Sequence, residues 1–210
     1  MPARPGRPNK QDSAEASARI IDAACLYFAR QGVKGSTYKQ IGAAAGVSAA
    51  MVHYYFKQKE DLYLAVIESA FKPLMEKLEK IEDLDTWVQN FHKHIMDRLW
   101  FPHLMLREVL PHNGELRSLF LAHCAPHVFG SLKALVSQEV ASVPRAEELD
   151  VDRHVVLLMG MLVYPFLGME IVQNVTGRKF DKRMLNSFRD DALALFHRGI
   201  GTEPPSGRSG

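Results

Sequence analysis

The 210-residue sequence has little cysteine and no long hydrophobic run. Its two cysteines, Cys25 and Cys124, are too few for a disulfide framework and lie in apolar, helix-like stretches. The longest uncharged stretch, residues 155–169, contains Pro165 and is closed by Glu170, so it is short for a membrane span of about 20 residues. No apolar core follows the basic N-terminus, so we expect no signal peptide. These features favour a reduced cytosolic protein that contacts no membrane.

Signatures of catalysis are missing as well. The sequence contains no evident nucleophile–base pair, phosphate-binding glycine loop or paired-carboxylate site, so we expect neither an enzyme nor a cofactor. Six of the nine histidines lie between residues 92 and 127, and His123 and His127 are four residues apart. That spacing can place two metal ligands on one helical face, but no third candidate ligand lies at a sequence spacing typical of a metal site. We expect no metal; a metal-binding helical enzyme or sensor is the alternative.

The small net charge of +2 is unevenly distributed. Residues 1–60 hold nine Lys and Arg against four Asp and Glu, whereas residues 61–210 hold 17 against 20. A basic front end on a mildly acidic body indicates that the front end meets a polyanion.

Signals for β-strands are almost absent, and helical periodicity predicts an all-α fold. We expect helices over 12–31, 38–45, 49–56, 57–84, 86–100, 103–110, 114–143, 151–175 and 181–199. Pro73 is expected to bend the fourth helix, and Pro126 to interrupt the seventh. The predicted domains are a basic arm (1–11), a helix-turn-helix domain (12–60), a helical ligand-binding and dimerisation domain (61–200) and a disordered tail (201–210).

Two short helices joined by "AAGVS" have the layout of a helix-turn-helix. Gly46 suits the turn, and Ser48 caps the second helix. We expect an apolar face to pack on the first helix through Ile41, Ala44, Val47, Val52 and Phe56. Ala49, Ala50, Met51 and His53 are left outward, so small side chains occupy the turn that a recognition helix inserts into the major groove. A plain helical hairpin is the alternative.

The segment "RIIDAACLYFARQGVKGSTYKQIGAAAGVSAAMVHYYFKQKEDLY", residues 19–63, resembles the N-terminal domain of the TetR family of bacterial transcriptional regulators. The resemblance rests on the order helix, glycine, short helix, "AGVS", aromatic cluster and "FKQKEDL". It implies phosphate contacts by Thr37, Tyr38 and Lys39, groove contacts by Ser48, Ala49, Ala50, Met51 and His53, and backbone phosphate contacts by Tyr55 and Lys59.

The sequence departs from the family at His53, where members usually carry tyrosine. No Arg, Lys, Asn or Gln lies between Ser48 and Tyr55, so the helix tip has no bidentate pair for guanine or adenine. We therefore expect specificity from apolar contact of Ala50 or Met51 with thymine methyls, from His53 and from DNA shape.

The N-terminal run "RPGRP" predicts a further DNA contact. Arg4 and Arg7 could lie in a narrow A·T-rich minor groove. The alternative is a tail without a role.

The family's C-terminal helices form a homodimer around a small-molecule pocket, which the resemblance extends to this chain. We expect the interface at Gly160, Gly168, Leu185, Phe188, Ala192, Leu195 and Phe196; packing into the chain's own core is the alternative. Soft and aromatic side chains suit an apolar or aromatic inducer. The predicted pocket comprises Phe91, Ile95, Trp100, Met105, Phe120, His123, His127, Met159 and Tyr164, although each could be ordinary core.

The resulting prediction is a cytoplasmic, dimeric regulator that binds double-stranded operator DNA on the nucleoid. As a repressor, it would leave that DNA when an inducer binds, with the helix from Lys57 onward as the lever. An activator, a regulator without a ligand and a helical interaction protein without DNA binding remain open.

Overall fold

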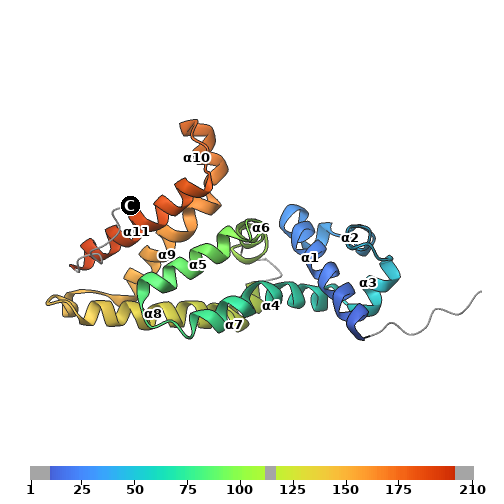
Figure 1. Ribbon diagram of the computed structural model, residues 1–210, viewed down its shortest axis with the longest axis horizontal. Helices are drawn as coiled ribbons and strands as arrows, with labels where there is room; N and C mark the ends of the chain where they lie inside the picture. The colour runs from blue at the N-terminus through green and yellow to red at the C-terminus, as the bar shows by residue number, and fades with distance from the viewer. Residues whose placement is uncertain (1–9, 112–116, 202–210) are drawn as a thin grey trace, which may run out of the picture. The chain divides into compact units, whose positions relative to one another are not determined.

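The computed structural model describes residues 10–111 and 117–201 of the chain (Figure 1). All regular elements within those ranges are helical, which confirms the predicted fold class. They are α1 (Lys10–Gly35), α2 (Tyr38–Ala45), α3 (Ala49–Tyr55), α4 (Lys59–Leu78), α5 (Leu84–Met96), α6 (Trp100–Leu104), η1 (Met105–Val109), α7 (Arg117–His123), α8 (Ala125–Ala141), η2 (Ala146–Glu148), α9 (Val151–Leu167), α10 (Met169–Thr176) and α11 (Lys182–Ile200). Arg4, Arg7 and His112 lie outside the described residues.

The chain divides into two compact units. The first contains the described residues up to Phe71 together with the described part of His103–Leu119. The second contains Lys72–Pro102 and the described residues from Phe120 onward. This division differs from the predicted boundary after residue 60, because the first half of α4 and the π-helical turn η1 belong with α1–α3.

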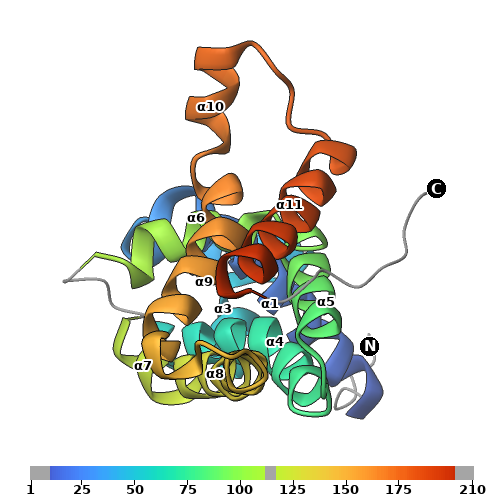
Figure 2. The same ribbon diagram turned by 90° about the vertical axis from the view of Figure 1, so that its left-hand side faces the viewer.

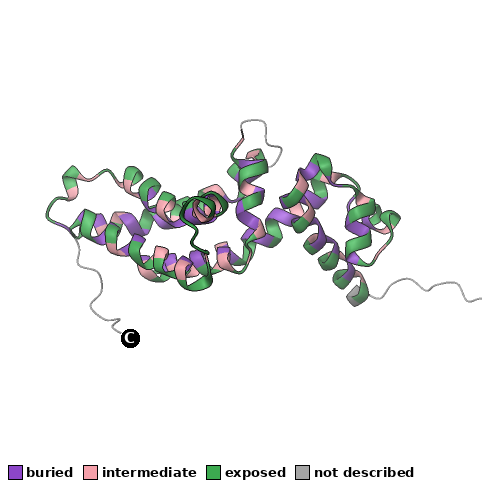
Figure 3. Ribbon diagram, turned by 90° about the horizontal axis from the view of Figure 1, so that it is seen from above, coloured by how far each residue is buried: buried purple, intermediate pink, exposed green. Residues whose placement is uncertain are grey.

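The first unit has a small apolar core contributed by its four N-terminal helices. Fully buried side chains come from each of them: Ile20 and Phe28 of α1, Ile41 of α2, Val52 of α3 and Leu62 of α4. The burial pattern of these helices is visible in Figure 3. The prediction that Ala44 belongs to this core is wrong, because Ala44 is exposed and its neighbour Ala45 is buried instead. On a helix as short as α2, a shift of one position moves a side chain by about 100° around the axis.

The second unit is a helical bundle in which α9 packs on α8 and α11, and α5 packs on α8 and α11. The Trp87 ring lies against that of Phe91 with centroids 5.0 Å apart, and its indole nitrogen donates to Ser131 Oγ at 3.0 Å. Leu132, Leu158 and Phe166 complete the apolar interior. A large buried aromatic whose polar atom finds a partner fixes how the surrounding helices pack.

Several helix boundaries differ from those predicted. The predicted helix 151–175 is wrong, since α9 ends before Gly168 and α10 leaves it at an angle of 68°. The break expected at Pro126 lies at Cys124, and Pro126 stands in the first turn of α8. Proline is tolerated there because the N–H groups of a first turn have no intrahelical acceptor.

In the described part of the chain, no single helix is both long enough and apolar enough to cross a membrane.

Candidate DNA-binding surface

The turn between α2 and α3 is closed by local hydrogen bonds. Thr37 and Gln40 form a capping box at the start of α2, with Gln40 N donating to Thr37 Oγ1 at 3.2 Å and Thr37 N donating to Gln40 Oε1 at 2.9 Å. Gly46 ends α2 in the left-handed region, at φ 70° and ψ 31°. Met51 N donates to Ser48 Oγ at 3.2 Å and starts α3. The predicted caps and turn are thereby confirmed.

Helix α3 presents its small side chains outward. Ser48, Ala49, Ala50 and His53 are exposed and Met51 is half-buried, while Val52 and the C-cap residue Phe56 are buried. Small exposed residues in the first turn let a helix backbone approach base edges closely. Val52 and Phe56 pack in the core of the unit and hold α3 in place. The first turn, with its small side chains, therefore faces outward.

At the start of α2, Thr37 and Lys39 are exposed and available to a phosphate backbone. Tyr38 is half-buried, and its hydroxyl donates to the Phe56 carbonyl oxygen at 2.9 Å. Burial raises the pKa of Tyr38, and the Asp61 and Glu60 carboxylates raise it further. The hydroxyl therefore stays protonated at neutral pH and ties α2 to the end of α3.

Two predicted phosphate ligands have partners within the protein. Lys59 Nζ donates to the Val33 carbonyl oxygen at 3.0 Å, and the Tyr55 hydroxyl donates to Ser13 Oγ at 3.1 Å. Both side chains are half-buried. These partners lie 26 and 42 residues away in the sequence, which is why local pattern could not reveal them. The interactions join α4 and α3 to α1 and leave Lys57 as the exposed cation of that loop.

Sequence reasoning missed Tyr54. Its side chain is 75% exposed and packs edge-on against the Tyr55 ring, with centroids 5.5 Å apart. A large exposed aromatic next to the bare first turn adds apolar surface and a hydroxyl to the outward face of α3. The signal was present in "HYY", where two adjacent rings cannot both face the core of one helix.

The residues of the predicted ligand pocket differ in burial. Phe91, Ile95 and Phe120 are buried, Trp100, Met105 and Met159 are half-buried, and His123, His127 and Tyr164 are exposed. These three lie at the surface of the chain, where His127 Nδ1 lies 3.0 Å from Glu79 Oε1 and Tyr164 is 60% exposed. Periodic soft residues build helical cores as readily as cavities, so the pattern could not separate the two.

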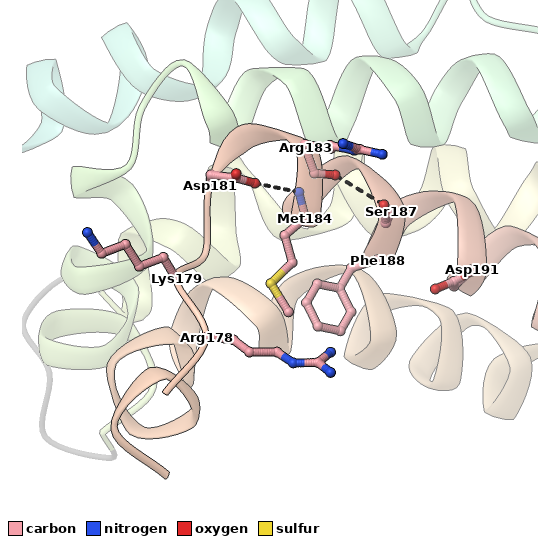
Figure 4. A pocket seen from close by; sticks show the side chains of 8 residues that line it. All are labelled: Arg178, Lys179, Asp181, Arg183, Met184, Ser187, Phe188 and Asp191. Carbon is pink, nitrogen blue, oxygen red and sulfur yellow. Dashed lines mark hydrogen bonds between the residues drawn. The ribbon is translucent and has the colours of Figure 1, made fainter. Parts of the chain in front are cut away.

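A hollow of about 600 Å³ lies in the second unit at the start of α11 (Figure 4). Arg178, Lys179 and Arg183 line it together with Met184 and Phe188. In Figure 4 the three cationic groups point in different directions and do not converge on one anion. Within the described ranges, no group of three or more His, Cys, Asp or Glu could hold a metal ion.

The predicted interface residues divide by exposure. Gly160 and Leu195 are exposed and Phe188 is half-buried, but Gly168, Leu185, Ala192 and Phe196 are buried within the chain. This corrects the assignment of those four as contacts with a second protomer, because the chain's own helices already cover them. Leu185, Ala192 and Phe196 lie on the side of α11 that packs on α9 and α5. The sequence pattern assigned this side of the helix to the dimer interface.

Comparisons with known proteins agree with the geometry of the first unit. The family model described as "Bacterial regulatory proteins, tetR family" matches residues 20–66. The HTH-type transcriptional regulator AcrR of Shigella flexneri is 36% identical over 62 residues. That match covers 30% of this chain and 29% of AcrR, so the chain matches less than a third of that relative.

Solved structures extend the likeness of the fold to most of the chain. The fatty acid degradation regulator FadR of Bacillus halodurans has a TM-score of 0.68 and 19% identity, with 98% of this chain and 100% of that one covered. FadR of Bacillus subtilis in complex with stearoyl-CoA has a TM-score of 0.67 and 20% identity, with 85% and 96% covered. At such identities the likeness establishes a shared fold.

Proposed function

We propose that this chain, whose N-terminal domain is that of the TetR family of bacterial regulators, is a transcriptional repressor that binds operator DNA and releases it when a small molecule binds. The observation that carries the proposal is the outward face of α3, where Ala49 and Ala50 are exposed behind the Ser48 cap. A helix tip without side-chain bulk is suited to the floor of a major groove. This role also implies a location in the cytoplasm, where chromosomal DNA lies.

Specificity in this proposal depends on apolar contacts and on DNA shape. Ala50 and Met51 would meet thymine methyl groups, and His53 and Tyr54 would reach the groove wall. Thr37, Lys39 and Lys57 would contact phosphates, which fix orientation without reading sequence. The arm with Arg4 and Arg7 would add a minor-groove contact.

Dimerisation is proposed through exposed apolar side chains of the last three helices. Val156, Leu157 and Tyr164 of α9, Ile171 and Val175 of α10, and Leu195 of α11 are each more than half exposed. Helix α10 has no buried residue and projects from α9 in Figure 2. An isologous contact over such a face would give the two-fold dimer that an operator with two half-sites about 34–36 Å apart, or somewhat more, requires.

The inducer is proposed to be a small apolar or aromatic molecule bound in the helical body. Two considerations support this: the second unit's interior is rich in adaptable apolar side chains, and FadR of Bacillus subtilis, similar in fold, was solved with stearoyl-CoA. To release DNA, the ligand must favour one conformation over the other by about 1–3 kcal/mol. The relatives are named as regulators, and no catalytic role is proposed.

The test measures fluorescence anisotropy of DNA from immediately upstream of the coding region, against a scrambled duplex, at several salt concentrations. Ala50→Glu places a carboxylate at the groove floor and should weaken binding by about 100-fold or more, since it removes close approach and repels phosphates. Ala134→Glu adds the same charge at an exposed alanine of α8 and should leave binding within about twofold, because α8 is not among the helices proposed to contact DNA and exposed charges are screened by salt.

Specific binding by two protomers per site, lost in Ala50→Glu and kept in Ala134→Glu, supports the proposal. Equal losses in both variants would refute α3 as the reading helix. If the upstream DNA is not discriminated, selection from fragmented genomic DNA tests whether any operator exists; failure to enrich a sequence would refute the regulator function.

A further inference from the structure

The peptide groups at the break in α1 are held by side chains from distant parts of the chain. Gly32 interrupts the helix at φ 77° and ψ 169°. Because that conformation breaks the helical ladder, the next peptide groups need other partners. Lys59 Nζ of α4 donates to the Val33 carbonyl oxygen at 3.0 Å, and Ser36 Oγ donates to the Gly32 carbonyl oxygen at 2.7 Å.

The Val33 N–H finds its acceptor on η1. It donates to Glu108 Oε1 at 3.1 Å, across 75 residues of sequence. Both ends of this bond are buried, since Glu108 is 9% exposed and Val33 is 4% exposed. A buried carboxylate is costly unless it accepts hydrogen bonds, so its position here is specific.

The turn that carries Glu108 is itself unusual and braced. Leu110 N donates to the Met105 carbonyl oxygen at 2.9 Å, closing a π-helical turn. Such turns are rare and are often found at functional sites. Arg117 Nη1 reaches the carbonyl oxygens of Val109 and Leu110, each at 3.3 Å. A Cβ added at Gly32 would lie 2.7 Å from Glu108 Oε1, so the carboxylate and the glycine fit each other closely.

Hydrogen bonds continue from this junction to the start of α2. Ser36, which is fully buried, lies directly before Thr37 of the capping box. Gln31 Nε2 contacts Ser36 Oγ at 3.5 Å and Gln40 Oε1 at 3.3 Å. Residues 31–40 thus form one connected stretch, and its far end carries the side chains proposed to contact phosphates.

We infer that Glu108 is a positioning residue for operator binding: by accepting the Val33 N–H it fixes the Gly32–Val33 break and, through Ser36, the orientation of the α2 N-terminus toward DNA. This inference rests on the proposed function. Glu108 lies in the segment His103–Leu119, whose two ends continue into the second unit. Its side chain is therefore a chemically defined means by which that segment influences the DNA-reading helices.

The test compares Glu108→Leu, which keeps the bulk and removes the acceptor, with Glu108→Gln, which keeps an oxygen acceptor and removes the charge. Hydrogen–deuterium exchange of the full-length, DNA-free protein gives the first measurement. Amides of residues 33–40 should exchange about tenfold faster in Glu108→Leu, because a buried hydrogen bond is lost, and near the wild-type rate in Glu108→Gln. Val140→Ala removes buried methyl groups and leaves a cavity in the second unit, so it is the control for general destabilisation.

Binding to the upstream or selected duplex gives the second measurement. Glu108→Leu should weaken binding about tenfold and lower the slope of log affinity against log salt by about 1, as for one lost phosphate contact. Glu108→Gln and Val140→Ala should keep the wild-type slope. Gly32→Ala, which crowds the Glu108 carboxylate and strains the backbone at φ 77°, should reproduce the defect of Glu108→Leu.

Each outcome has a distinct meaning. Faster exchange confined to Glu108→Leu and Gly32→Ala, with the lower salt slope, supports the inference. Equal effects in Val140→Ala, or faster exchange with unchanged affinity and slope, would overturn it and leave Glu108 a structural residue. If wild-type protein reads no DNA sequence, the proposed function fails, and this inference fails with it as a statement about operators. The exchange measurement then still decides whether Glu108 holds residues 33–40.

Discussion

The proposed base reading by α3 can be tested at Met51, a half-buried residue next to the exposed Ala50. Met51→Ala should lower discrimination between operator and scrambled DNA by about fourfold, the free energy of roughly one buried methylene at a thymine methyl. Binding to scrambled DNA should not change. Met75→Ala, at a half-buried methionine of α4, is the matched control. Unchanged discrimination in Met51→Ala would exclude Met51 from reading.

His197 couples stability to pH. It is 4% exposed, and its Nε2 lies 2.9 Å from Asp85 Oδ1. That hydrogen bond raises the pKa of His197 against the opposing effect of burial, with further support from the Asp85 and Glu139 charges. The folded state therefore binds the proton more tightly than the unfolded chain. This contribution is complete below about pH 6.5 and is lost as pH rises through the folded pKa.

Thermal unfolding from pH 5 to pH 9 should show this loss at the alkaline end, and His197→Gln should flatten the dependence above about pH 6.5. His92 provides the contrast: burial lowers its pKa, helped by the Arg189 charge, so its contribution falls as pH drops below about 6.5. His92→Gln should flatten only the acid side. A dependence above pH 6.5 that survives in His197→Gln would assign it to another group.

Among the elements, α3 is the shortest of those that would meet DNA, with seven residues. A helix of that length is not stable alone in water and depends on its cap and its packing. Ser48→Ala should lower the free energy of unfolding by about 1 kcal/mol, since Met51 N loses its acceptor. Chemical denaturation measures this, and Ser137→Ala, at a half-buried serine inside α8, should change stability by less than about 0.5 kcal/mol. Equal losses would show that the cap contributes nothing specific.

The elements also show what could be read from sequence. The caps at Thr37, Gly46 and Ser48 were predictable because each signal lies within four residues of its partner. The break at Gly168, the inward turn of Lys59 and the hydrogen bond from the Val33 N–H to Glu108 were not. Each depends on packing or on a partner far along the chain, such as the 75 residues between Glu108 and Val33. The outward side of α3 and its apolar packing were therefore predicted, whereas the hydrogen bond from Tyr55 to Ser13 of α1 was missed.

For the whole molecule, the exposed apolar face of α9–α11 predicts the oligomeric state. Leu157→Glu, at a residue 54% exposed, should shift a dimer toward monomer in light scattering, because a buried unpaired charge is strongly disfavoured at an interface. Leu26→Glu introduces the same change at a residue of α1 that is 48% exposed, and should leave the dimer intact. Dissociation in both variants, or in neither, would contradict this interface.

The basic arm is a second test at this scale. Deleting residues 2–10 should weaken operator binding and lower its salt slope by about 2, because the deletion removes the two arginine charges proposed to lie in the minor groove. Replacing only Arg4 and Arg7 by glutamine separates charge from chain length. An unchanged slope in both variants would leave the arm without a role in binding.

The described residues of the segment 103–119 belong to the first unit, which limits how modular the protein is. A chimera that joins residues 1–60 to another regulator's body would leave Glu108 behind, and with it the acceptor for the Val33 N–H. Exchange of DNA-reading heads between such regulators should therefore succeed only when the incoming body supplies an oxygen acceptor at the corresponding turn. Residues 1–60 are continuous in sequence, but the Val33 N–H among them depends on Glu108, which lies much later in the chain. Substitutions in these two parts of the sequence therefore have to occur together.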